Sequence, residues 1–147
     1  MQRATIFQDF AKRSNIWETA IKGIQAHPLL GEGPLTYFHI YKQYHGHPTQ
    51  HAHSIYLDPI LSHGIIGVIL AGIYFAGNLK EVYLLLKRRI DLRLFSLISA
   101  FILTILIHGI LDYTVYWVQT GLLFLIVLSA SSMYFHKEQP YDIQEEH

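Results

Sequence analysis

Four histidines lie within the stretch HGHPTQHAHS, residues 45–54. An imidazole can bind a metal ion, change its charge near neutral pH, or accept a proton from a hydroxyl during catalysis. His47 and His51 have the spacing that places two rings on one face of a helix. The pairs His45/His47 and His51/His53 have the alternate spacing that suits an extended chain. The types and spacing of these residues therefore indicate either a metal site, a solvated polar loop, or the rim of a catalytic pocket.

A metal site at this cluster has little support from the surrounding residues. Zinc sites commonly take three or four histidine or carboxylate ligands, and the rings are usually oriented by further carboxylates. The only carboxylate close by in the sequence is Asp58. We therefore expect no metal here, although zinc or copper capture by a histidine-rich membrane module remains an alternative function.

The composition excludes several other functions. The chain has 147 residues, of which 51% are hydrophobic and 15% charged, with 11 basic and 11 acidic side chains. Without a basic surface, nucleic acid is not an expected partner. With no cysteine, disulfides and thiolate chemistry are excluded.

Three long apolar segments fill the second half of the chain, at about 59–77, 94–111 and 115–135. Each has between 18 and 21 residues. At about 1.5 Å per residue, such a helix spans roughly the 30 Å hydrocarbon core of a bilayer. The sequence thus predicts an all-α integral membrane protein with about three transmembrane helices.

The charges between these segments predict the orientation in the membrane. The loop between the first two segments holds five basic residues: Lys80, Lys87, Arg88, Arg89 and Arg93. The positive-inside rule places this loop in the cytoplasm. Residues 1–58 and the turn at 112–114 are then extracytoplasmic, and the tail 136–147 is cytoplasmic.

Short amphipathic helices are expected in the extracytoplasmic segment 1–58. Apolar residues recur with helical spacing over residues 4–26, and Asn15 with Glu18 has the pattern of a capping box, which predicts a break near Ser14. Pro28 should end this helix by His27. Because residues 1–58 lack a signal-peptide core, we expect preceding transmembrane helices, from a longer chain or a partner subunit, to direct their export.

Three stretches, in order, resemble the C-terminal half of the O-antigen ligase and O-antigen polymerase family. They are RSNIWETAIKGIQAHPLLGEGPLTYFHIY, HAHSIYLDPILSHGIIGVIL and HGILDYTVYWVQTGLLFLIVLS. The family signature is His-[Asn/Ser/Gln], nine residues, then Gly-x-x-Gly. It is matched without departure by His53 and Ser54 followed by Gly64 and Gly67. We also expect the two glycines to allow close helix packing.

Further family features are Arg13 placed four residues before Trp17, the HPLLGEGP turn, and the pair His108 and Asp112. The topology places His53, His108 and Asp112 on the same outer face. His108 and Asp112, four residues apart, are expected to pair along one helix, either for function or simply to hold the helix end.

The resemblance implies a function and a location. It implies a larger GT-C-like helical bundle in the bacterial cytoplasmic membrane, with its active site on the extracytoplasmic face and no cofactor. Such a glycosyltransferase transfers glycan from a polyprenyl-diphosphate-linked donor to a glycan or lipid acceptor, as a polymerase or a ligase. In this interpretation His53 is the base or positions the hydroxyl, Arg13 binds the diphosphate, and Ser54, His108 and Asp112 support them. A non-catalytic scaffold subunit is the remaining alternative.

Overall fold

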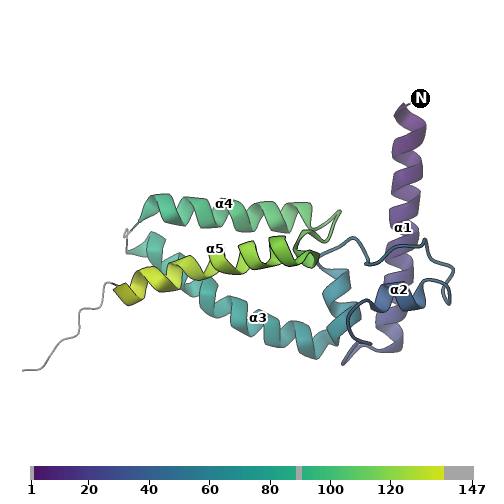
Figure 1. The fold of residues 1–147 in the computed structure, drawn as a ribbon, viewed down its shortest axis with the longest axis horizontal. Helices are drawn as coiled ribbons and strands as arrows, with labels where there is room; N and C mark the ends of the chain where they lie inside the picture. The colour runs from purple at the N-terminus through teal and green to yellow at the C-terminus, as the bar shows by residue number, and fades with distance from the viewer. Residues whose placement is uncertain (1, 89–90, 138–147) are drawn as a thin grey trace, which may run out of the picture.

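The computed structural model describes residues 2–88 and 91–137, and in that part of the chain it contains helices and no strands (Figure 1). The elements are α1 (Gln2–Ala26), α2 (Thr36–Ile40), α3 (Leu57–Lys87), α4 (Leu92–His108), the 3₁₀ helix η1 (Thr114–Tyr116) and α5 (Val118–Lys137). The predicted all-α class is confirmed. Most of the predicted cytoplasmic tail, from residue 138 onward, lies outside the described residues.

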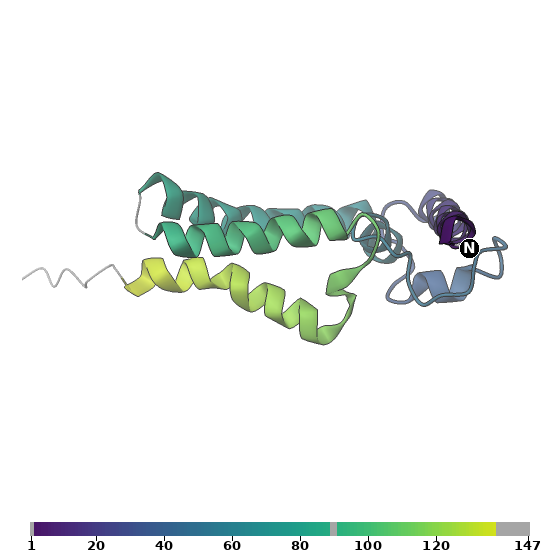
Figure 2. The same ribbon diagram turned by 90° about the horizontal axis from the view of Figure 1, so that it is seen from above.

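Helices α3, α4 and α5 run side by side as an elongated bundle, and α1 crosses one end of it at a steep angle (Figures 1 and 2). Helix α2 and the loop that follows it lie at the same end, beside α1. The segment before α3 thus forms a cap on one end of the bundle.

Helix α1 is a single unbroken helix of 25 residues, so the predicted break near Ser14 is wrong. Asn15 does not cap a second helix, because it lies inside α1 and its side-chain amide donates to the His45 carbonyl at 3.4 Å. The helix ends at Ala26, where the chain approaches Pro28, as expected.

One helix in the described part of the chain, α3, is long and apolar enough to cross a membrane, with 31 residues. It continues past the predicted end at residue 77 to Lys87, so most of the predicted basic loop is helical. The reason is that Val82 and Leu85 are buried against Ile98 of α4. Helix α4 and the 118–130 part of α5 are shorter apolar helices, and the three-span topology therefore stays a prediction.

Helix α4 begins at Leu92 because Asp91 caps it. The Asp91 carboxylate accepts hydrogen bonds from the amides of Arg93 and Leu94, both at 2.9 Å. An acidic N-cap side chain satisfies amides that lack helical partners.

Helix α3 is broken at Gly64, where φ is 64° and ψ is −177°. A side chain there would overlap the carbonyl of Leu29, because the turn 28–33 is inserted against the break. Four backbone hydrogen bonds join the two segments: Ile65 N to Pro28 O, Ile66 N to Leu29 O, Glu32 N to Leu61 O and Gly33 N to Ser62 O. Gly64 therefore allows the turn 28–33 to approach α3, and not another helix. A Cβ at Gly67 would meet only His63 of its own helix, so in the described part of the chain neither glycine lies at a close helix–helix contact.

A small core joins the cap to the bundle. Its buried members, which come from α1, α2, the following loop and α3, are Ile16, Ala20, Tyr37, Ile40, Ala52 and Leu61. The loop that carries the four clustered histidines, residues 45–54, is called the histidine loop. Because Ala52 belongs to this core, the loop is anchored between His51 and His53.

Candidate active site

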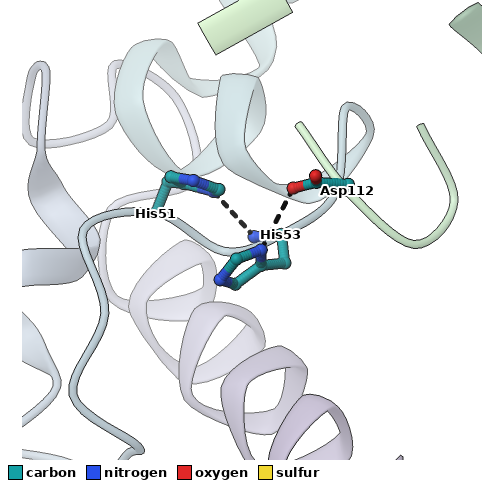
Figure 3. Close-up of side chains that lie close together, drawn as sticks. All are labelled: His51, His53 and Asp112. Carbon is teal, nitrogen blue, oxygen red and sulfur yellow. Dashed lines mark hydrogen bonds and ion pairs between the residues drawn. The ribbon is translucent and has the colours of Figure 1, made fainter. Parts of the chain in front are cut away.

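The His53 and Asp112 side chains meet at the capped end of the bundle, as Figure 3 shows. Nδ1 of His53 lies 3.1 Å from Oδ1 of Asp112, across 59 residues of sequence. The side chain of His53 is 31% exposed and that of Asp112 is 44% exposed. The pair is therefore accessible to a ligand from outside.

Two contacts bring the loop before α3 to the end of α4. The amide of Ile55 donates to the Gly109 carbonyl and the hydroxyl of Tyr56 to the Leu106 carbonyl, both at 2.9 Å. A Cβ at Gly109 would overlap the Ile55 side chain, so this close approach needs glycine. Asp112 follows within one turn of these anchored residues.

The backbone at His53 is strained, with a φ of 47°. A non-glycine residue in this left-handed region costs about 1 to 3 kcal/mol and is typical of functional sites. The conformation is held by the His53 amide, which donates to Nδ1 of His51 at 3.2 Å, and by the Ala52 amide, which donates to the Asp58 carboxylate at 2.7 Å. The hydroxyl of Ser54 accepts from the amide of Tyr56, so it fastens the loop to the start of α3.

His51, which the sequence interpretation left outside the site, is part of it. It is 7% exposed, and its ring lies 4.3 Å from that of His53 and 4.6 Å from that of Tyr116. Burial lowers the pKa of His51 below 6.5, and the neighbouring His53 adds to the shift. His51 thus remains neutral near pH 7, with Nδ1 able to accept the His53 amide.

Asp112 is ionised in this arrangement. Burial alone would raise its pKa, but hydrogen bonds from His53 and from the amide of Tyr113, with the charge of the histidines, lower it below 3.8 overall. An ionised carboxylate can only accept, so His53 Nδ1 carries the proton and Nε2 carries the free lone pair. That lone pair is what a general base needs.

A hydroxyl already lies at the basic nitrogen. Oγ1 of Thr49 is 3.1 Å from Nε2 of His53. Thr49 is half-buried, between the exposed residues Pro48 and Gln50. Thr49 could not be predicted from the sequence, because no pattern marks a residue four positions before a histidine whose backbone is left-handed.

His108 takes no part in the pair expected for it. It ends α4 and is exposed, and only its backbone carbonyl contacts Asp112, accepting from the Asp112 amide at 3.1 Å. The Asp112 carboxylate points to His53 instead. The predicted pairing of the His108 and Asp112 side chains is therefore wrong, because the chain turns out of the helix after His108.

Arg13 lies on α1, and one of its terminal guanidinium nitrogens is buried without a hydrogen-bond partner. Nε1 of Trp17, one turn further along, is also buried and without a partner. No hydrogen bond or ion pair in the described part of the chain joins Arg13 to His53 or Asp112. A cationic donor left without a partner has its bonding capacity free for an anion.

His51, His53 and Asp112 are also the residue types of a metal site. Their candidate ligand atoms all lie within 4.8 Å of one another, so the three side chains could hold a metal ion. The lone pair on Nδ1 of His51 is already used by the His53 amide. The observed hydrogen bonds therefore favour an Asp–His pair over a metal centre.

An apolar cavity of about 570 Å³ adjoins the site. It lies between α3, α4 and α5 and extends from His63 and Tyr113 at the capped end to Leu79 and Leu128. Tyr113 also packs edge-on against His51, with ring centres 6.1 Å apart, so the cavity begins beside the histidine cluster.

In a comparison with known families, the family model described as O-antigen ligase matches residues 4–72. This range includes Arg13, the histidine loop and Gly64, and it ends before α4 and Asp112. The comparisons with curated proteins and with solved structures find no match for this chain.

Proposed function

We propose that this chain, whose residues 4–72 match the O-antigen ligase family model, supplies the acid–base site of a membrane glycosyltransferase. The reaction moves a glycan from a polyprenyl-diphosphate carrier to an acceptor hydroxyl, as a polymerase or a ligase, on the outer face of the bacterial cytoplasmic membrane. The observation that carries this proposal is the 3.1 Å contact between His53 Nδ1 and Asp112 Oδ1.

In the proposed reaction, Nε2 of His53 takes the proton of the acceptor hydroxyl as its oxygen attacks the anomeric carbon. The bond from that carbon to the diphosphate breaks, and its electron pair leaves with the diphosphate. The ionised carboxylate of Asp112 stabilises the imidazolium that forms and holds the ring in the productive tautomer. The pair thus provides both proton transfer and orientation.

Three other features support the same proposal. The unpartnered guanidinium nitrogen of Arg13 suits the diphosphate, which gains negative charge as it leaves. The apolar cavity beside Tyr113 suits part of the carrier's hydrocarbon chain. The many exposed apolar side chains of α3, α4 and α5, such as Ile73 and Ile107, suit contact with lipid and with the further membrane helices that the family resemblance implies.

The test is complementation of a strain that lacks the full-length gene, with surface polysaccharide and protein level measured together. His53→Ala and Asp112→Asn should each lower product by about 10²-fold or more, the range for loss of a general base or its orienting carboxylate. His47→Ala is the matched control, because only its backbone carbonyl is bonded, to Tyr37. Full activity of His53→Ala at normal protein level would contradict the proposal.

A further inference from the structure

The hydroxyl of Thr49 is hydrogen-bonded to Nε2 of His53, the nitrogen that must accept the proton in the proposed reaction. The His53 ring is bonded at both nitrogens: Nδ1 to Asp112 and Nε2 to Thr49, each at 3.1 Å. Because Nδ1 carries the proton, Nε2 is the acceptor and the Thr49 hydroxyl is the donor. Thr49 therefore makes the same hydrogen bond to His53 that the hydroxyl of an acceptor would have to make.

A single imidazole lone pair accepts one well-aligned hydrogen bond in the plane of the ring. The Thr49 hydroxyl and an acceptor hydroxyl cannot both hold that position. Thr49 is also a secondary alcohol, like the ring hydroxyls of a sugar, so its hydroxyl resembles the acceptor in chemical type.

The position of Thr49 allows it to move. It lies at the tip of the loop between α2 and α3, with exposed residues on both sides, whereas the loop is anchored further along at Ala52 and His53. Rotation of the Thr49 side chain or a local shift of residues 48–50 would free Nε2 without breaking the contacts that hold His53 in place.

Resting on the proposed function above, we propose that Thr49 is an internal competitor of the acceptor: its hydroxyl occupies Nε2 of His53 until a sugar hydroxyl displaces it. The contact keeps water off the base in the absence of acceptor. It also sets part of the acceptor KM, because each productive encounter must break the Thr49 hydrogen bond.

The first test does not depend on turnover. Diethyl pyrocarbonate modifies unprotonated imidazole nitrogens, and its rate at His53 can be followed by mass spectrometry of the full-length protein, with exposed His108 as the internal reference. Thr49→Val keeps the shape of the side chain and removes the hydroxyl. It should raise the rate of His53 modification roughly 2- to 10-fold, which corresponds to the net free energy of one hydrogen bond. Thr49→Ser should keep the slow rate. An unchanged rate in Thr49→Val would overturn the proposal.

The second test uses kinetics with purified donor and acceptor. Thr49→Val should lower the acceptor KM by a similar factor, about 2- to 10-fold, with little change in kcat, while the exposed neighbour variant Gln50→Ala leaves both unchanged. An unchanged KM, or turnover abolished in Thr49→Val and retained in Thr49→Ser, would show that Thr49 does not compete. If the wild type transfers no glycan, the proposed function fails, and the modification rates still decide whether Thr49 covers Nε2.

Discussion

At the level of single residues, the site is built on His53, whose amide and both ring nitrogens have hydrogen-bond partners. The amide of His53 is bonded to His51, Nδ1 to Asp112 and Nε2 to Thr49. These bonds offset the strain of a left-handed backbone at His53 and fix the ring against rotation. An orientation set in advance reduces the entropy lost on reaching the transition state.

The buried ring of His51 predicts a dependence of stability on pH. Its folded pKa is lowered below 6.5, so its contribution is complete above about pH 6.5 and is lost as pH falls through the folded value. The groups facing it are His53, Asp112, Tyr113 and Tyr116, and burial raises the pKa of Tyr113 to about 12, so that phenol stays neutral.

Thermal unfolding of the full-length protein, measured from about pH 8 to about pH 5.5, checks this prediction. His51→Asn retains an acceptor where Nδ1 lies but cannot titrate. The midpoint temperature of His51→Asn should therefore fall less on acidification than that of the wild type. Because both proteins contain the other histidines, the difference between their midpoints reports His51 alone. Parallel curves for the two proteins would contradict a role for the His51 proton.

At the scale of elements, the turn 28–33 and the break in α3 form one unit. The break at Gly64 exposes amides and carbonyls that the turn satisfies with four hydrogen bonds. This unit ties the end of α1 to the start of the bundle.

Gly64→Ala should destabilise the protein by at least about 1 to 3 kcal/mol, because alanine is strained at positive φ and its Cβ would overlap the Leu29 carbonyl. Gly77→Ala is the matched control, because it lies in α3 with open space around it and should be neutral or stabilising by about 0.5 to 1 kcal/mol. Thermal unfolding in detergent and protease sensitivity of the 28–33 turn measure both. Equal stability of the two variants would contradict the claim that the turn 28–33 needs a glycine at position 64.

At the scale of the whole molecule, the His53–Asp112 bond constrains the topology. Both residues must lie on the same side of a membrane, so the chain between them, which contains α3 and α4, must cross it an even number of times. The basic residues near the turn between α3 and α4 favour the cytoplasm for that end. Helix α4, at 17 residues, reaches about 26 Å, slightly less than the bilayer core of about 30 Å.

Residues 1–147 contain no cysteine, so single introduced cysteines can report the topology of this part once any cysteine outside it has been replaced. In intact cells, a membrane-impermeant maleimide should label Gln43→Cys and Val118→Cys in the full-length protein. Leu92→Cys should react only after the cells are permeabilised. All three positions are exposed in the structure, so access depends on the membrane alone. Labelling of Leu92→Cys in intact cells would contradict the three-span topology.

The helical class, the end of α1 before Pro28 and the start of α3 near residue 59 were predictable from local rules, which are the length of the apolar segments and the backbone restrictions of proline. The choice of His53 among the four clustered histidines came from the motif of the family resemblance and stays a prediction. The sequence predicted that Asp112 lies on the same face as His53, but not that the two side chains pair, because a partner 59 residues away leaves no mark in periodicity or spacing.

Only the tertiary structure showed that Asp112 turns to His53 rather than to His108, that His51 and Thr49 complete the site, and that Gly64 accommodates a turn instead of a helix. Each of these depends on a local departure from regular backbone: the left-handed conformation at His53, the chain leaving the helix after His108, and the break at Gly64. Such departures are stabilised by contacts between segments distant in sequence, so local propensity does not predict them.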